Sequence, residues 1–469
     1  MKKFDFCFLI TETFIAARQK ARVIKELEKR GYSCLAVTTS EAGDIVMKEF
    51  SVSNFLNIFK ASQNFMTRDG ELEERVCEIE KTFKIENLRV EILTDHMLFQ
   101  SVKGNESDLL KEMIGYILAL KNFFQKNEIE IGCFVQGISG SVNSFAFYHF
   151  AKIHSKHVYH SPAPFNELIC FSFDHWGIFD INPKNMPTPS LEEEKFISDY
   201  ISVLKQEKKL ISYVSLAQTN PHLTKGKIKT FISLFRDGNY KKQNLPIFFI
   251  VKNFWLRFLR KRYAQKFYSM PIPGEKYVFF PLHFPFDSQL TLRAVPFITQ
   301  EFVIEIISRY LPFGYKLYVK EHPAAEGWYS PEMLKYINRI PNVKLVPRYI
   351  NAHDLIKKAE MVCVINSTAG FEALLWQKPV ITFGRSFYSD KGITLDVKNL
   401  YDLPEIINKA KDFKPDWDKV LATVNYWYKN SFPPSPQEIF SPDTDPKQKT
   451  IETFCDSLLK YLKPNETNE

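Results

Sequence analysis

The chain reads KLYVKEHPAAEGWY at 316–329 and MVCVINSTAGFEALLWQKPVITFG at 361–384, and these two segments decide its fold class. They contain three apolar runs of strand length, Lys316–Lys320, Met361–Ile365 and Val380–Phe383, each followed by polar or small residues. In a parallel α/β sheet, ligands bind beyond the carboxyl ends of the strands. The two segments therefore predict a parallel sheet with ligand-binding chemistry along one edge.

The turn that follows the second run, NSTAG at 366–370, has the composition of an anion site. We predict a helix over 371–376, and free backbone N–H groups at a helix start attract negatively charged groups. Ser367 and Thr368 add hydroxyl donors without bulk, and Gly370 lets the backbone approach a phosphate closely. The turn therefore predicts a phosphate site at the end of the strand.

Polar side chains near this turn extend the predicted site. Glu372 lies in the first turn of the predicted helix, where a carboxylate either accepts hydrogen bonds from a ribose diol or simply complements the helix dipole. His322 and Pro323 follow the strand that ends at Lys320. A histidine can donate to a phosphate oxygen and changes protonation near neutral pH, and a proline ends the strand. Together with Asn366, and with Lys320 as a secondary phosphate ligand, these residues predict a nucleotide-phosphate site.

Two further strand ends in this half of the chain are predicted to face the same ligand. His283 follows an apolar run at 277–282, and Tyr388 follows the run at 380–383. Both side chains would lie beyond the carboxyl ends of strands in one sheet. We therefore include His283 and Tyr388 among the predicted donor contacts.

The N-terminal part begins with a predicted strand, helix and strand at 4–11, 14–30 and 34–39. Apolar residues recur at helical spacing within the second of these segments, and a glycine ends it. A β-α-β opening is how a doubly wound domain starts. Glu12 lies past the first strand end, where it is either a general base or an acid that stabilises the helix start without chemistry.

A second group of carboxylates lies in the aromatic stretch after the predicted strands at 131–135 and 157–160. Glu167 and Asp174 fall in this loop-rich segment, where a carboxylate could activate an acceptor hydroxyl or attack a donor sugar. Glu12, Glu167 and Asp174 are therefore the candidate catalytic residues, with a slight preference for Asp174.

No metal or cofactor is expected. His154, His157 and His160 have a spacing compatible with metal ligands, but two of them fall in a predicted strand. The seven cysteines include no CxxC pair, and several lie in apolar runs, which is typical of buried free thiols in a reducing compartment. The DTD sequence at 443–445 imitates a metal-binding motif, but it lies between prolines, where a surface turn is favoured.

The charge of the chain favours anionic partners. Its 62 Lys and Arg exceed its 54 Asp and Glu, and the net charge of +8 suits nucleotide sugars, acidic glycans or anionic lipid. The basic, apolar segment 241–268 either lies on an anionic membrane surface or packs between domains with its charges solvated. Because we find no signal peptide, no apolar run of about 18 residues and no nucleic-acid motif, we expect a cytoplasmic or membrane-peripheral protein without a nucleic-acid partner.

Four segments resemble the capsule polysaccharide biosynthesis family, which includes the Kdo transferases of capsule assembly: PLHFPFDS at 281–288, LPFGYKLYVKEHP at 311–323, NVKLVP at 342–347 and NSTAGFEALLWQKPVITFGRSFY at 366–388. The resemblance implies a metal-independent GT-B glycosyltransferase, an α/β fold in which two Rossmann-like domains face each other across a cleft and the C-terminal domain holds the nucleotide. It also implies a nucleotide-sugar donor, best CMP-Kdo or another CMP-ulosonic acid. The implied acceptor is a surface polysaccharide or its lipid-linked primer.

The same resemblance assigns roles to individual residues. The His-Pro and Ser/Thr motifs of related CMP-sugar transferases bind the CMP moiety, which implies this role for His322, Pro323, Ser367 and Thr368. Glu372 matches the ribose-binding acid that is common in GT-B enzymes.

We predict four parts: an acceptor domain at 1–190, a helical basic connector at 191–270, a nucleotide-sugar-binding domain at 271–415, and C-terminal helices at 416–469, which in GT-B folds often cross back to the first domain. Two other classes of function stay open. A UDP-sugar transferase, a UDP-sugar epimerase or a CDP-polyol phosphotransferase would use a similar site. A non-catalytic polysaccharide assembly or export subunit would keep the fold without turnover.

Overall fold

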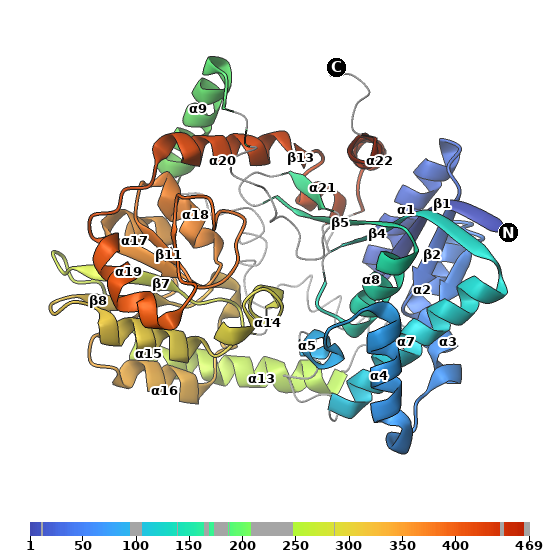
Figure 1. Cartoon of the computed structure of the whole chain (residues 1–469), viewed down its shortest axis with the longest axis horizontal. Coiled ribbons are helices and arrows are strands. Elements are labelled where there is room, and N and C mark those ends of the chain that lie inside the picture. The colour runs from blue at the N-terminus through green and yellow to red at the C-terminus, as the bar shows by residue number, and fades with distance from the viewer. Residues whose placement is uncertain are drawn as a thin grey trace. The chain divides into compact units, whose positions relative to one another are not determined.

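The computed structural model describes residues 1–469 except 11–12, 94–105, 138, 164–167, 173–185, 187, 208–246, 286, 441–444 and 464–469, and it describes the side chains of neither 247–251 nor 253–254. The chain forms two compact α/β units (Figure 1). The first unit comprises Met1–Gly177, Asn220–Phe249 and Asn430–Glu469, and the second comprises Ile178–Thr219 and Ile250–Lys429.

Within the described residues, a seven-stranded sheet carries the first unit, in the order β13-β6-β5-β4-β1-β2-β3. Strands β5, β4, β1, β2 and β3 are parallel to one another. At one edge of the sheet, β6 pairs antiparallel with β5, and β13 pairs antiparallel with β6. The strands are β1 (Lys2–Ile10), β2 (Cys34–Thr38), β3 (Phe55–Asn57), β4 (Ile129–Gly137), β5 (Lys156–Pro162), β6 (Ile169–Ser172) and β13 (Ser431–Phe432).

Helices of the first unit bury one apolar face each against this sheet or against one another. In α1, the side chains of Ala17, Ile24 and Leu27 share a face and are buried, and the Thr13 hydroxyl accepts the Ala16 N–H at 3.2 Å to cap the helix. The helices are α1 (Phe14–Lys29), α2 (Glu41–Glu49), α3 (Ile58–Ser62), α4 (Leu72–Phe83), α5 (Leu88–Ile92), α7 (Glu106–Lys126), α8 (Val142–His154), α21 (Pro436–Phe440) and α22 (Gln448–Leu462).

The chain returns to the first unit at its C-terminal end. Helix α22 lies against α1 and buries Ile451, Phe454 and Leu458 in the core of this unit. An ion pair of 2.5 Å between Arg30 and Asp456 joins the two helices at their surface. The first sheet is therefore covered by segments from both ends of the sequence.

The second unit is built on a parallel sheet of six described strands in the order β12-β11-β10-β7-β8-β9. The strands are β7 (Tyr277–Pro281), β8 (Lys316–Lys320), β9 (Val343–Val346), β10 (Met361–Val364), β11 (Val380–Thr382) and β12 (Leu395–Asp396). The helices are α9 (Leu191–Glu207), α13 (Ile247–Ala264), α14 (Ser288–Thr291), α15 (Gln300–Tyr310), α16 (Pro331–Arg339), α17 (Ala352–Lys358), α18 (Thr368–Leu375), α19 (Leu403–Ala410) and α20 (Trp417–Lys429).

Both sheets follow the doubly wound order. In the first, the chain runs outward from β1 through β2 to β3 and then restarts on the other side of β1 with β4; in the second, β7, β8, β9 and β10 do the same. The direction reverses between β1 and β4 and between β7 and β10, and such a switch point opens a crevice at the carboxyl ends of the strands. The predicted α/β class with two Rossmann-like sheets is confirmed.

One predicted helix boundary is wrong in a way that matters for the site. Helix α18 begins at Thr368, not at 371, because the Ser367 hydroxyl accepts the Ala369 N–H at 3.3 Å and caps the helix. Glu372 is therefore the fifth residue of the helix and lies outside its first turn. Complementing the helix dipole consequently does not explain this carboxylate.

No helix among the described residues combines the length and the hydropathy that a bilayer span requires.

Candidate functional site

A small pocket of about 50 Å³ lies at the carboxyl ends of β7 and β8 and at the start of α18. These elements meet at the switch point of the second sheet, and the volume suits a group the size of a few water molecules. Predicted site residues from separate parts of the sequence are brought together here. The lining residues are Phe279, Pro281, Leu282, Lys320, Glu321, His322, Pro323, Ala352, Ser367, Thr368, Ala369 and Glu372.

A hydrogen bond between His283 and Asn366 joins the segments that follow β7 and β10, the two strands that flank the switch point. The Asn366 backbone N–H donates to His283 Nε2 at 3.5 Å, and its side-chain Nδ2 donates to the Gln289 carbonyl at 2.6 Å. Burial lowers the pKa of His283 to about 4, so its ring is a neutral acceptor at physiological pH. His283 therefore supports the turn after β10 rather than carrying positive charge into the pocket.

His322 presents a neutral donor to the pocket. Its Nδ1 accepts the Ala324 N–H at 3.2 Å, so the proton of the neutral ring resides on Nε2. Burial lowers its pKa to about 4, with smaller contributions from His283 and Lys320. The expectation that this histidine titrates near neutral pH is therefore wrong, whereas a donor role toward an anion is compatible with the geometry.

Lys320 and Glu372 are two buried ionisable groups that line the pocket. Burial lowers the pKa of Lys320 to about 8, and the Glu372 carboxylate opposes that shift. Burial raises the pKa of Glu372 to about 8, and Lys320 in turn opposes this shift. At neutral pH both groups are mainly protonated, so the pair carries a net positive charge that an anionic ligand would neutralise.

Glu321 and His353 belong to this site but were not among the predicted ligands. Burial raises the pKa of Glu321 to about 7, and the nearby Tyr268 hydroxyl lowers it by a smaller amount. The carboxyl oxygens of Glu321 make no hydrogen bond of good geometry to a described residue. His353 Nδ1 accepts the Trp376 indole N–H at 3.0 Å, and its Nε2 lies 3.8 Å from a Glu372 oxygen. Glu321 adjoins the His-Pro pair and could have been found from that position, whereas His353 has no local signal.

Gly370 and Tyr388 fit together beneath the turn. An added Cβ on Gly370 would lie 2.2 Å from the Tyr388 hydroxyl oxygen. That hydroxyl donates to the Ser367 carbonyl, and the tyrosine is fully buried. The glycine thus makes room for Tyr388, which is a different reason from the predicted approach of a phosphate, and Tyr388 holds the turn from inside the protein.

The three candidate catalytic residues, Glu12, Glu167 and Asp174, lie outside the described residues. The described residues contain no group of three or more His, Cys, Asp and Glu side chains placed to hold a metal ion. Of the histidines once considered for metal binding, His157 and His160 are buried in β5, and His160 bonds to Lys20.

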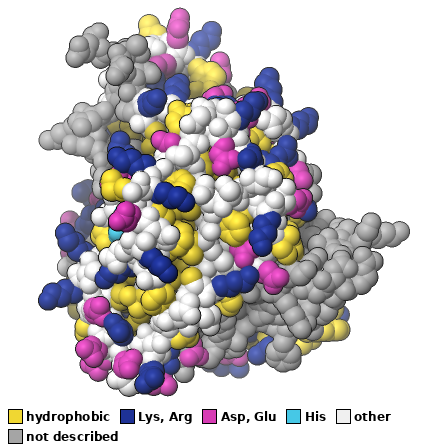
Figure 2. Space-filling view, turned by 90° about the vertical axis from the view of Figure 1, so that its right-hand side faces the viewer, with side chains coloured by type: hydrophobic (Ala, Val, Ile, Leu, Met, Phe, Trp, Pro, Cys, Tyr) yellow, Lys and Arg dark blue, Asp and Glu magenta, His cyan; other side chains and the backbone are white. Residues whose placement is uncertain are grey.

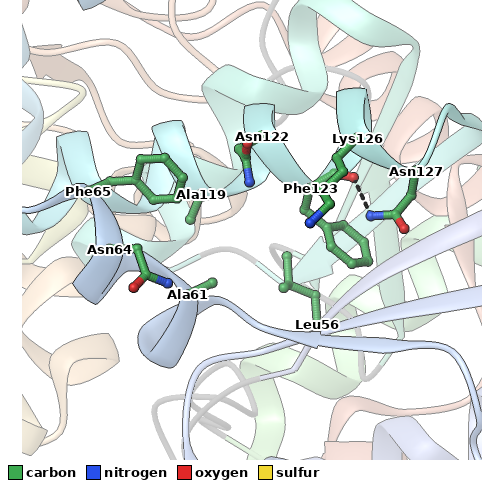
Figure 3. Close-up of a pocket in the computed structure, with 9 residues that line it drawn as sticks. All are labelled: Leu56, Ala61, Asn64, Phe65, Ala119, Asn122, Phe123, Lys126 and Asn127. Carbon is green, nitrogen blue, oxygen red and sulfur yellow. Dashed lines mark hydrogen bonds between the residues drawn. The ribbon is translucent and has the colours of Figure 1, made fainter.

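A larger pocket of about 340 Å³ lies in the first unit between β3, α3 and α7 (Figure 3). Its polar groups are Asn64, Asn122, Lys126 and Asn127, and all four of these residues are exposed. Figure 3 shows the Asn127 amide turned to the Phe123 carbonyl at 2.8 Å. This pocket offers no buried charge and no helix start, so the pocket of the second unit is the better candidate for the predicted anion site.

We expect Glu372 to make the stability of the second unit fall as pH rises. Its carboxyl pKa is about 8 in the folded chain and 4.5 in the absence of burial. Between these values the folded state keeps a proton that the unfolded chain has lost, so the contribution of Glu372 to stability is greatest below pH 4.5 and declines up to pH 8. The free energy of unfolding of Glu372→Gln should equal that of wild type near pH 4.5. It should exceed that of wild type by about 2–4 kcal/mol near pH 8.

Urea unfolding followed by tryptophan fluorescence tests this at both pH values. Five of the six tryptophans lie in the second unit, so the signal reports mainly on it. The exposed Glu405→Gln serves as the control and should not alter the pH dependence. An unchanged pH dependence in Glu372→Gln would show that this carboxyl does not hold the extra proton.

Comparisons with known proteins agree with the motifs quoted above. Residues 249–426 match the family described as capsule polysaccharide biosynthesis protein, in agreement with the resemblance carried by those motifs. The chain is 31% identical over 140 residues to the capsule polysaccharide export protein KpsS of Escherichia coli, a match that covers 28% of this chain and 34% of that protein. It is 27% identical over 129 residues to the capsule polysaccharide modification protein LipB of Neisseria meningitidis, covering 25% and 30%. These matches span about a third of the length of the curated relatives.

Solved structures with similarity to this chain include the β-Kdo 2,7 transferase of Thermosulfurimonas dismutans KpsC. The TM-score is 0.34 at 13% sequence identity, and the match covers 74% of this chain and 89% of that chain. A UDP-GlcNAc 2-epimerase of Methanocaldococcus jannaschii has a TM-score of 0.28 and 11% identity, with coverage of 91% and 99%.

Proposed function

We propose that this chain, whose residues 249–426 match the capsule polysaccharide biosynthesis family, is a metal-independent glycosyltransferase of the GT-B type. It transfers a sugar from a nucleotide donor to a capsular or other bacterial surface polysaccharide, or to its lipid-linked primer. The favoured donor is a CMP-linked ulosonic acid such as Kdo. The observation that carries this proposal is the meeting of Lys320, His322 and the start of α18 in one pocket at a switch point.

The pocket suits the phosphate of the leaving nucleotide. That phosphate would accept hydrogen bonds from the backbone N–H group at Thr368, from His322 Nε2 and from the Lys320 ammonium. Glu372, protonated at neutral pH because its pKa is about 8, would both donate to and accept from the ribose hydroxyls.

The bond between the anomeric carbon and the phosphate oxygen breaks, and the phosphate keeps the bonding electrons. Lys320 and the Nε2–H of His322 stabilise the negative charge that develops there. The acceptor hydroxyl forms the new bond to the anomeric carbon and passes its proton to a carboxylate, for which Glu12, Glu167 and Asp174 remain the proposed candidates.

We further propose that the reaction takes place in the cytoplasm, against the inner face of the membrane. The described cysteines are all free, and six of the seven are buried, which supports a reducing compartment.

A turnover assay tests the proposed activity. The purified chain is supplied with CMP-Kdo and a Kdo-primed glycolipid, and release of CMP together with extension of the glycolipid is expected. Lys320→Met should abolish most of the turnover, because it removes the cation beside the phosphate. Turnover of UDP-sugars instead would establish one of the other enzyme classes. Absence of any turnover despite intact nucleotide binding would favour an assembly or export role.

A further inference from the structure

Helix α13, which is labelled in Figure 1, carries two opposite faces of different character. Of its described side chains, the exposed ones are Lys252, Trp255, Phe258, Leu259 and Arg262. At 100° per residue, these five positions fall within about 60° of one line along the helix. We call this set the α13 outer stripe.

The inner face of α13 is docked on the second unit. The Arg257 guanidinium lies 5.0 Å from the Trp328 ring centroid, and the Lys261 ammonium pairs with Glu326 at 3.2 Å. At Gly327, an added Cβ would lie 2.3 Å from the Arg257 carbonyl oxygen, so the two backbones are in close contact. The helix is therefore fixed in one rotation, and its outer stripe faces away from this unit.

The outer stripe reverses the usual arrangement of a surface helix. Its aromatic and aliphatic side chains are highly exposed, at 60% for Trp255, 48% for Phe258 and 60% for Leu259. On the inner face, the side chains that contact the rest of the protein include the cations Arg257 and Lys261. A helix on the surface of a globular protein normally buries its apolar side instead. An exposed cluster of this kind marks an interaction site.

The charge around the stripe identifies the partner. Residues 241–270 contain eight Lys and Arg and no Asp or Glu. On the face shown in Figure 2, by contrast, basic and acidic side chains are interspersed. Apolar side chains flanked only by cations match an anionic lipid surface, where the rings and Leu259 enter the headgroup boundary and Lys252 and Arg262 meet lipid phosphates.

We propose that the α13 outer stripe binds the chain to an anionic phospholipid bilayer. The stripe lies parallel to the surface and does not cross the bilayer. This goes beyond the proposed glycosyl transfer and does not depend on it, because lipid binding is measured with no nucleotide present.

Vesicle flotation of the full chain tests the proposal. Wild type should float with phosphatidylcholine vesicles that contain phosphatidylglycerol, should not float with phosphatidylcholine alone, and should be released by high salt. Lys252→Gln with Arg262→Gln should weaken binding about 30-fold at low salt. Trp255→Ser with Phe258→Ser and Leu259→Ser should weaken it at least tenfold, as roughly expected from the apolar area removed.

Phe313→Ser is the matched control, since Phe313 is a fully exposed aromatic of the same unit outside α13. It should leave lipid binding unchanged. A second measurement places the contact itself: brominated lipids should quench wild-type tryptophan fluorescence, and Trp255→Phe should lose most of that quenching while it still binds. Failure of wild type to bind anionic vesicles, equal loss in Phe313→Ser, or quenching that survives in Trp255→Phe would each overturn the proposal.

Discussion

Replacement of Lys320 by methionine should weaken CMP binding by about 10- to 150-fold, the range expected for losing a hydrogen bond to a charged group. Lys320 is buried at the end of β8, and with a pKa of about 8 its ammonium is protonated at neutral pH. Methionine keeps the length of the side chain and removes the buried charge, so we expect the stability of the fold to be kept or increased. Isothermal titration at pH 7 measures the affinity.

The pH dependence of binding gives the same experiment a second readout. As pH rises through about 8, Lys320 loses its proton, and wild-type affinity should fall toward that of the variant. Lys316→Met, at the opposite end of the same strand, should bind CMP as wild type does. Equal affinities of Lys320→Met and wild type at pH 7 would show that this lysine does not contact the phosphate.

Replacement of Gly370 by alanine should destabilise the second unit by about 2 kcal/mol or more. Alanine is the better helix former by about 0.5–1 kcal/mol, but its Cβ would lie 2.2 Å from the Tyr388 hydroxyl oxygen. Overpacking of this kind costs about 1–3 kcal/mol and occasionally more, so the clash outweighs the gain in propensity. Urea unfolding by tryptophan fluorescence measures the loss.

A matched set of variants isolates the cause. Adding Tyr388→Phe to Gly370→Ala should recover part of the stability, because it removes the oxygen nearest to the new methyl group. If the double variant is no more stable than Gly370→Ala, contact with the Tyr388 hydroxyl is not what the glycine avoids.

The strands that carry the site could be predicted because burial on both faces leaves a clear apolar signal. The predicted runs at 316–320, 361–365 and 380–383 correspond to β8, β10 and β11 within one residue at each end. Short strands such as β6, β12 and β13 were not predicted. Their pairing partners in the sheet, rather than their own residues, place them at its edge.

The parts of the site that could not be predicted depend on contacts between distant residues. Tyr388 lies 18 positions from Gly370, and their fit is visible only in three dimensions. The lowered pKa of His322 and the raised pKa of Glu372 arise chiefly from burial in the folded unit. The start of α18 was placed too late because Ala369 and Gly370 were assigned to the turn, whereas the Ser367 cap brings both into the helix.

Calorimetric binding of CMP, CDP and UMP to wild type and to His322→Ala tests the central claim most directly, namely that the pocket at the β7–β10 switch point holds the donor's nucleotide. We predict that CMP binds, that it binds more tightly than CDP or UMP, and that His322→Ala weakens it about tenfold or more. Because the pKa of His322 is about 4, this loss should be the same at pH 6 and pH 8. No binding of any of the three nucleotides to folded wild type would contradict the assignment of the pocket.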